Sequence, residues 1–157
     1  MKNKFLKKYI HLCIYLFSTY FFSQTKQLNM IVMIDEKISK SIYDFTINDP
    51  TIAGKMIVGK YTPGNLTFET SDYNKFIKND IKNYKISFNA IETITKDLVS
   101  EKSYDMEIPS FFLNQEYVII YIFKMNNKTY KKKYSKLIKD NKEYYVIIET
   151  PNSMKFN

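Results

Sequence analysis

The chain has 157 residues, a formal net charge of +8 and 24 basic residues, all of which are Lys. Its single His and single Cys, His11 and Cys13, lie within the first 23 residues, and it has no Trp. Imidazole, thiolate and guanidinium groups carry much of enzyme catalysis, metal ligation and bidentate anion recognition. Beyond residue 23 the sequence therefore excludes Ser-His-Asp triads, Cys-His pairs and the usual zinc and copper sites.

The N-terminal segment has the pattern of an export signal. Lys side chains crowd residues 1–8, an apolar run covers residues 9–22, and the small residue Ser23 follows it. This order is typical of a secretory signal peptide over residues 1–23. Because the apolar run is shorter than the roughly 20 residues of a spanning helix, a membrane anchor formed by an uncleaved leader is the alternative. We expect a secreted or periplasmic protein.

Residues 24–157 predict a single domain that is long enough to bury a hydrophobic core. This part of the chain has no Cys, so disulfides cannot stabilise it and the core must do so alone. An exported chain without disulfides fits a bacterial periplasm or outer surface at least as well as a eukaryotic secretory route. No linker or internal repeat divides this part of the chain.

Alternation of apolar and polar side chains dominates this domain, as at Tyr84, Ile86 and Phe88. A period of two is typical of half-buried strands, and β-branched and aromatic residues suit them. In chain order, this pattern and the turn residues predict strands over residues 28–34, 42–48, 55–61, 66–70, 83–94, 104–108, 116–125, 128–135 and 143–149.

Two stretches depart from the alternation. Residues 71–78 fit one or two helical turns or an ordered loop, and the polar residues 96–104 predict a connection. Successive hairpins are expected through residues 117–149, because turn residues separate the extended runs there.

Eight or nine short strands with at most one short helix predict an all-β fold. We expect a single-domain antiparallel β-sandwich, Ig-like or transthyretin-like in architecture. A small β-barrel is the alternative.

Few residues offer catalytic chemistry. Ser and Lys neighbours such as Ser135 and Lys136 would point to opposite faces of a strand, so they do not form a dyad. Two carboxylate pairs have spacings worth testing, Asp97 with Glu101 and Asp105 with Glu107. Acids on one face of a strand are usually solvated, so we interpret these pairs as surface residues. The sequence predicts no enzyme, no cofactor and no metal ion.

Charge is unevenly distributed along the chain. Residues 124–142 contain eight Lys and one acidic residue, Asp140. With Tyr130 and Tyr134 flanking three consecutive Lys, this segment predicts a surface that binds an anionic partner. The candidate contact residues are Lys124, Lys128, Tyr130, Lys131, Lys132, Lys133, Tyr134 and Lys136. The alternative is an edge strand whose Lys side chains only prevent aggregation.

These features predict a non-catalytic binding module of the cell envelope. Its expected partner is a protein or an anionic component such as polysaccharide, lipopolysaccharide or lipid headgroups. Specific nucleic-acid recognition is not expected, because Arg supplies the commonest bidentate base contact. The alternatives are a carrier of small hydrophobic ligands with a barrel interior and a carboxylate-dependent hydrolase.

Overall fold

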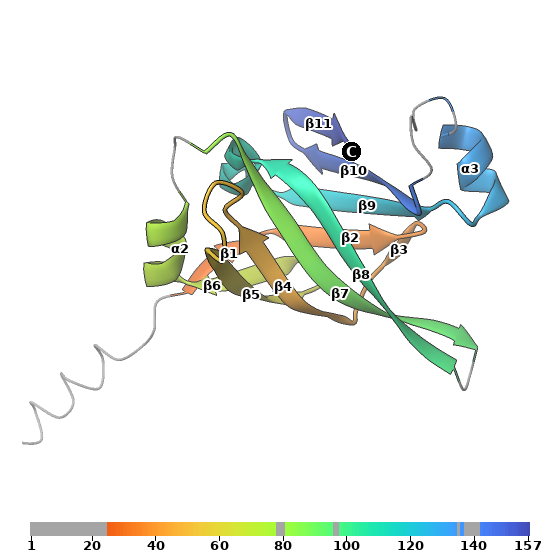
Figure 1. Ribbon diagram of the computed structural model, residues 1–157, viewed down its shortest axis with the longest axis horizontal. Coiled ribbons are helices and arrows are strands. Elements are labelled where there is room, and N and C mark those ends of the chain that lie inside the picture. Colours follow the sequence, from red (N-terminus) through yellow and green to blue (C-terminus); the bar gives the residue numbers. More distant parts are fainter. Residues whose placement is uncertain (1–24, 78–80, 96–97, 135, 137–141) are drawn as a thin grey trace, which may run out of the picture.

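The computed structural model describes residues 25–77, 81–95, 98–134, 136 and 142–157 of the chain. Two sheets pack face to face, and neither closes into a barrel (Figure 1). The predicted all-β sandwich is confirmed, and the small barrel considered as the alternative is wrong.

The first sheet has six antiparallel strands. Their order across the sheet is β1 (Thr25–Leu28), β6 (Asn65–Glu69), β5 (Met56–Thr62), β4 (Ile42–Asn48), β7 (Asn83–Thr95) and β8 (Leu98–Pro109). β7 and β8 form a long hairpin that extends beyond the rest of the sheet (Figure 1). The connection predicted over residues 96–104 is therefore wrong for residues 98–104, which belong to β8.

The second sheet has five strands. Their order is β11 (Ser153–Phe156), β10 (Tyr144–Thr150), β9 (Val118–Lys124), β2 (Met30–Ile34) and β3 (Lys37–Ile38). β2 and β9 run parallel, so the expectation of a purely antiparallel sandwich is wrong at this one pair. β11 was not predicted from the sequence. Pro151 ends β10, but a turn follows it and the chain pairs with β10 once more.

Apolar side chains from the inner faces of both sheets fill the space between them. Phe45, Tyr84 and Ile120 are among the fully buried residues of this core. Phe45 stacks on Phe88 with ring centroids 5.4 Å apart, a spacing that favours aromatic pairs. Burial alternates along β7 and β8 because one face of the first sheet packs on this core and the other meets solvent. On β4 a register shift between Tyr43 and Thr46 interrupts the alternation.

Among the described residues, three short segments are helical: α2 (Thr70–Phe76), the 3₁₀ helix η1 (Ser110–Asn114) and α3 (Lys128–Tyr134). α2 confirms the helical turns considered for residues 71–78 as far as Phe76; Ile77 is extended, and residue 78 lies outside the described residues. α3 shows that the strand predicted over residues 128–135 is wrong for residues 128–134, and residue 135 lies outside the described residues. The successive hairpins and the edge-strand alternative are therefore wrong as well. In the part of the chain that the structure describes, no helix has the length and hydrophobicity needed to cross a membrane.

Candidate functional site: a basic helix beside a polar cluster

α3 is held on the outer face of the second sheet by two tyrosines. Tyr130 and Tyr134 are four residues apart, so a helix places both on the same side. Both are buried, and their rings lie 5.1 and 4.8 Å from that of Phe123 on β9. Tyr134 also stacks on Tyr145 of β10 at 5.2 Å. These aromatic contacts explain how so short a helix is stable, since an isolated helix of this length is not.

Asn127 caps the start of this helix. Its side-chain oxygen accepts a hydrogen bond from the N–H of Thr129 at 3.0 Å, and its carbonyl accepts one from the N–H of Lys131 at 2.9 Å. Asn is a favoured residue for this position because its side chain satisfies a free backbone donor.

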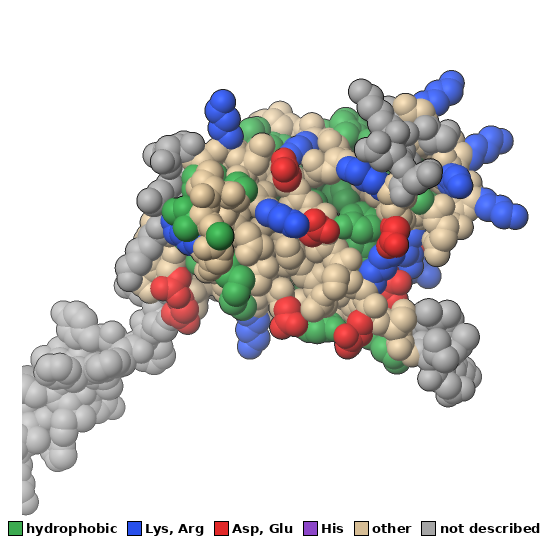
Figure 2. All heavy atoms as spheres, in the orientation of Figure 1, with side chains coloured by type: hydrophobic (Ala, Val, Ile, Leu, Met, Phe, Trp, Pro, Cys, Tyr) green, Lys and Arg blue, Asp and Glu red, His purple; other side chains and the backbone are tan. Residues whose placement is uncertain are grey.

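With the tyrosines packed inward, the lysines face outward. The exposed residues of this set are Lys128, Lys131, Lys132, Lys133 and Lys136. Figure 2 shows blue side chains projecting from the end of the molecule that carries α3. The Nζ of Lys133 lies 5.3 Å from the centre of the Tyr134 ring, within the range of a cation–π contact.

The structure therefore divides the eight predicted contact residues into three groups: five exposed lysines, two buried tyrosines and Lys124. Five lysines form one exposed surface, which we call the basic helix surface. Tyr130 and Tyr134, 9% and 7% exposed, support that surface from beneath. Their role as contact residues stays a prediction. A strand would have exposed one side of each ring, but the helix turns both rings onto the sheet.

Lys124 lies apart from the other predicted residues, at the end of β9. Its Nζ is 3.2 Å from a carboxylate oxygen of Asp35 and 3.2 Å from one of Glu92. Burial opposes the charge of Lys124, but the hydrogen bonds that its ammonium donates to Glu92 and Asp35 outweigh burial and raise the pKa of Lys124. Lys124 is thus a charged group held inside a polar cluster, with 23% of its side chain exposed.

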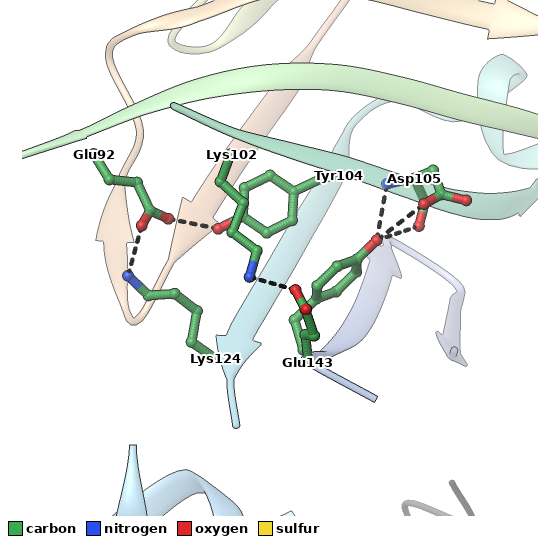
Figure 3. Close-up of polar contacts among 7 residues, drawn as sticks. Glu92, Lys102, Tyr104, Asp105, Lys124 and Glu143 are labelled. Atoms are coloured by element: carbon green, nitrogen blue, oxygen red, sulfur yellow. Dashed lines mark hydrogen bonds and ion pairs between the residues drawn. The ribbon is translucent and has the colours of Figure 1, made fainter. Parts of the chain in front are cut away.

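Glu92 extends the polar cluster toward the core (Figure 3). The hydroxyl of the buried Tyr104 donates a hydrogen bond to Glu92 at 2.5 Å. Burial and this carboxylate both raise the pKa of Tyr104, so its hydroxyl stays protonated. Tyr104 and Glu92 belong to the first sheet and Lys124 to the second, so these contacts join the two layers.

Asp35 reaches Lys124 from the two-residue turn that joins β2 to β3. Asp35 and Glu36 have φ angles of 49° and 66°, in a region that Gly or Asn adopts more readily. The carboxylate of Asp35 also accepts the backbone N–H of Lys124 at 2.9 Å. Non-Gly residues at such positions cost stability and are frequent at functional sites.

A second set of polar contacts also joins the first sheet to the second (Figure 3). The Tyr144 hydroxyl accepts the N–H of Asp105 and donates to the Asp105 carbonyl, both at 3.0 Å. These bonds satisfy backbone groups on β8, an edge strand, and so limit its pairing with other chains. Lys102 and Glu143 add an ion pair at 2.8 Å.

The predicted carboxylate pairs receive little support as catalytic groups. Asp105 is exposed, and the Lys85 ammonium at 2.8 Å, together with the Tyr144 hydroxyl, holds its pKa below the ordinary value. A general acid needs the opposite shift. Asp97 lies outside the described residues. Within the described ranges, no group of three or more His, Cys, Asp and Glu side chains is arranged to hold a metal ion.

Comparison with known proteins does not assign the chain to a family. No protein-family model matches the chain, and no curated protein or solved structure is significantly similar to it.

Proposed function

We propose that the protein is a non-catalytic binding module that contacts an anionic component of the cell envelope through the basic helix surface. The observation that carries this proposal is that α3 buries its two tyrosines against the sheet and exposes its lysines. Tyr130 and Tyr134 fix the helix to the sheet, while Lys128, Lys131 and Lys133 face solvent from a rigid base.

Clustered positive charge raises the local concentration of anions, and it does so without pockets or catalytic groups. Fixing the helix beforehand reduces the entropy lost on binding. The export signal expected over residues 1–23 supplies the proposed location, outside the cytoplasm in the periplasm or as a secreted protein.

The hydrophobic carrier receives no comparable support, because the barrel interior that it requires is replaced by two open sheets packed on a filled core. The hydrolase is likewise weakened by the low pKa of Asp105.

The proposal is tested with a variant in which Lys131, Lys132 and Lys133 are replaced by Ser. Binding to immobilised dextran sulfate and to phosphatidylglycerol vesicles is measured at rising salt concentrations. Each Lys near an anionic surface contributes roughly 1 kcal/mol, so we expect affinity at low salt to fall about 100-fold. Native binding should weaken as salt screens the charges.

The matched control replaces the exposed Lys26, Lys60 and Lys82 by Ser, which changes the net charge equally at sites away from α3. If the two triple variants lose affinity equally, net charge alone governs binding and the basic helix surface has no special role. If the native protein binds neither anionic surface, the proposed function is wrong.

A further inference from the structure

A cleft of about 580 Å³ lies beside the N-terminal end of α3, where Asn127 and Tyr130 are among its lining residues. Its walls come from the β2–β3 turn, the segment between β3 and β4, the outer part of β7 and the end of β9. Asp35, Glu92 and Lys124 of the polar cluster form part of its lining. This volume is within the range of small-molecule sites.

The lining combines hydrogen-bond donors, acceptors and apolar surface. Three ammonium groups face two carboxylates, which leaves an excess of one positive charge among Lys37, Lys40, Lys124, Asp35 and Glu92. Two hydroxyls and an amide add neutral polar groups, and they come from Ser39, Ser41 and Asn127. Ile38 and Ile91, 50% and 42% exposed, provide apolar patches.

This mixture fits a sugar ring. A pyranose carries several hydroxyls, each of which donates and accepts hydrogen bonds, and also presents apolar C–H faces. Carboxylates accept from hydroxyls, ammonium groups donate to them, and exposed isoleucines can pack against the ring.

The two carboxylates of the cleft are held in place by contacts within the protein. Lys124 bonds to Asp35 and Glu92, and Tyr104 holds the second oxygen of Glu92. Asp35 lies on a turn with φ angles of 49° and 66°, and its carboxylate also accepts the backbone N–H of Lys124 at 2.9 Å. Groups that need no rearrangement bind a polar ligand at a lower entropic cost.

The cleft and the basic helix surface are continuous, because Asn127 lines the cleft and also caps α3. A chain of sugars with one ring in the cleft would therefore carry its next residues toward Lys128 and Lys131. From this continuity we infer that the anionic partner is an acidic polysaccharide, of which one sugar unit occupies the cleft. This inference rests on the proposed function and narrows its ligand to one class.

The two competing polyanions fit this arrangement less well. A lipid headgroup would engage the lysines and leave the cleft unused. Single-stranded nucleic acid requires aromatic faces for base stacking, and Tyr130 and Tyr134 are buried against the sheet.

The test uses the variant Ser41→Trp. Ser41 is exposed at the cleft, so an indole there would fill the cleft while all five of its charged residues remain. The control is Ser71→Trp on α2, at the other end of the molecule (Figure 1). Thermal unfolding of both variants confirms that they are folded.

Binding is measured by titration calorimetry with three probes: hexagalacturonate, neutral maltohexaose and a polyphosphate of the same charge as the galacturonate. We expect hexagalacturonate to bind more tightly than polyphosphate. Ser41→Trp should weaken hexagalacturonate binding by about tenfold and leave polyphosphate binding unchanged. Ser71→Trp should change neither, and maltohexaose should bind weakly to the native protein alone.

The outcomes separate this inference from the proposed function. Equal binding of hexagalacturonate and polyphosphate, unaffected by Ser41→Trp, would overturn the sugar site while the anion-binding helix survives. Binding to vesicles or polyphosphate without any binding of hexagalacturonate would do the same and would point to a phosphate-bearing partner. Absence of binding to every anionic probe would overturn both.

Discussion

The replacement Tyr134→Ala should release α3 from the sheet. Tyr134 is 7% exposed, and its ring packs between Phe123 at 4.8 Å and Tyr145 at 5.2 Å. Removing a buried aromatic side chain usually costs 3–5 kcal/mol (about 3 is expected at this peripheral cluster). A helix of seven residues has no comparable stability of its own. We therefore expect the contact of Tyr130 with Phe123, which remains in this variant, to be too weak to hold α3 on the sheet.

Amide hydrogen exchange is the suitable assay, because it reports local opening separately from global unfolding. In the native protein the N–H of Lys131 is bonded to the Asn127 carbonyl at 2.9 Å and should exchange slowly. In Tyr134→Ala this amide should exchange at a rate close to that of an unfolded peptide, while amides of β4 and β7 remain protected. Binding to dextran sulfate should weaken in parallel.

The variant Tyr134→Phe keeps the ring and serves as the control, with stability expected within about 0.5 kcal/mol of the native value. Unchanged protection of Lys131 in Tyr134→Ala would refute the reasoning, because the aromatic contacts would then not be what holds the helix.

Three further predictions concern the scaffold. Gly59→Ala should destabilise the fold by about 1–3 kcal/mol in urea unfolding, because a Cβ at this position would lie 2.6 Å from a ring carbon of Phe68; an unchanged midpoint would show that the core adjusts freely. Glu36→Gly should stabilise it by about 1 kcal/mol, since Glu36 has a φ of 66°, and a loss of stability would contradict this. Hydrogen bonds from the Thr51 side chain and backbone, together with Lys55, lower the pKa of the Asp49 carboxyl despite its burial. A carboxyl whose pKa is lower in the folded state stabilises the fold above its unfolded pKa, so stability should fall as the pH drops below the ordinary value of 3.8. Asp49→Asn should reduce this pH dependence of thermal unfolding, and identical pH profiles would argue against it.

Much of the fold is predictable from the sequence because one face of most strands is buried. Alternation over residues 42–48 and 143–149 identifies β4 and β10 to within about one residue. The parallel pairing of β2 with β9 was not predictable, because nothing local in either segment specifies a partner so distant in sequence.

The error at residues 128–134 has a physical cause. Tyr130 and Tyr134 share a face in a strand and in a helix, so their spacing alone does not distinguish the two. Lys132 does distinguish them: a strand would place it on the same face as both tyrosines, whereas the helix places it on the opposite side. The three consecutive Lys also favour helix by intrinsic propensity.

The exposed lysines of the site could be predicted because charge is readable in the sequence. The polar cluster could not, because Glu92 and Lys124 meet only through the packing of two sheets. The one available signal was the acidic pair Asp35 and Glu36, placed between the apolar β2 and the next extended segment, where a two-residue turn fits.

Chemical-shift mapping by NMR tests the central claim most directly, namely that α3 and the cleft beneath it form the contact surface. Hexagalacturonate is added to the isotopically labelled native protein, and amide shifts are followed to saturation. We predict that the largest changes cluster in residues 127–134 and 35–41, with small changes on β4 and β5. Changes centred on another face, or none at saturating ligand, would contradict it.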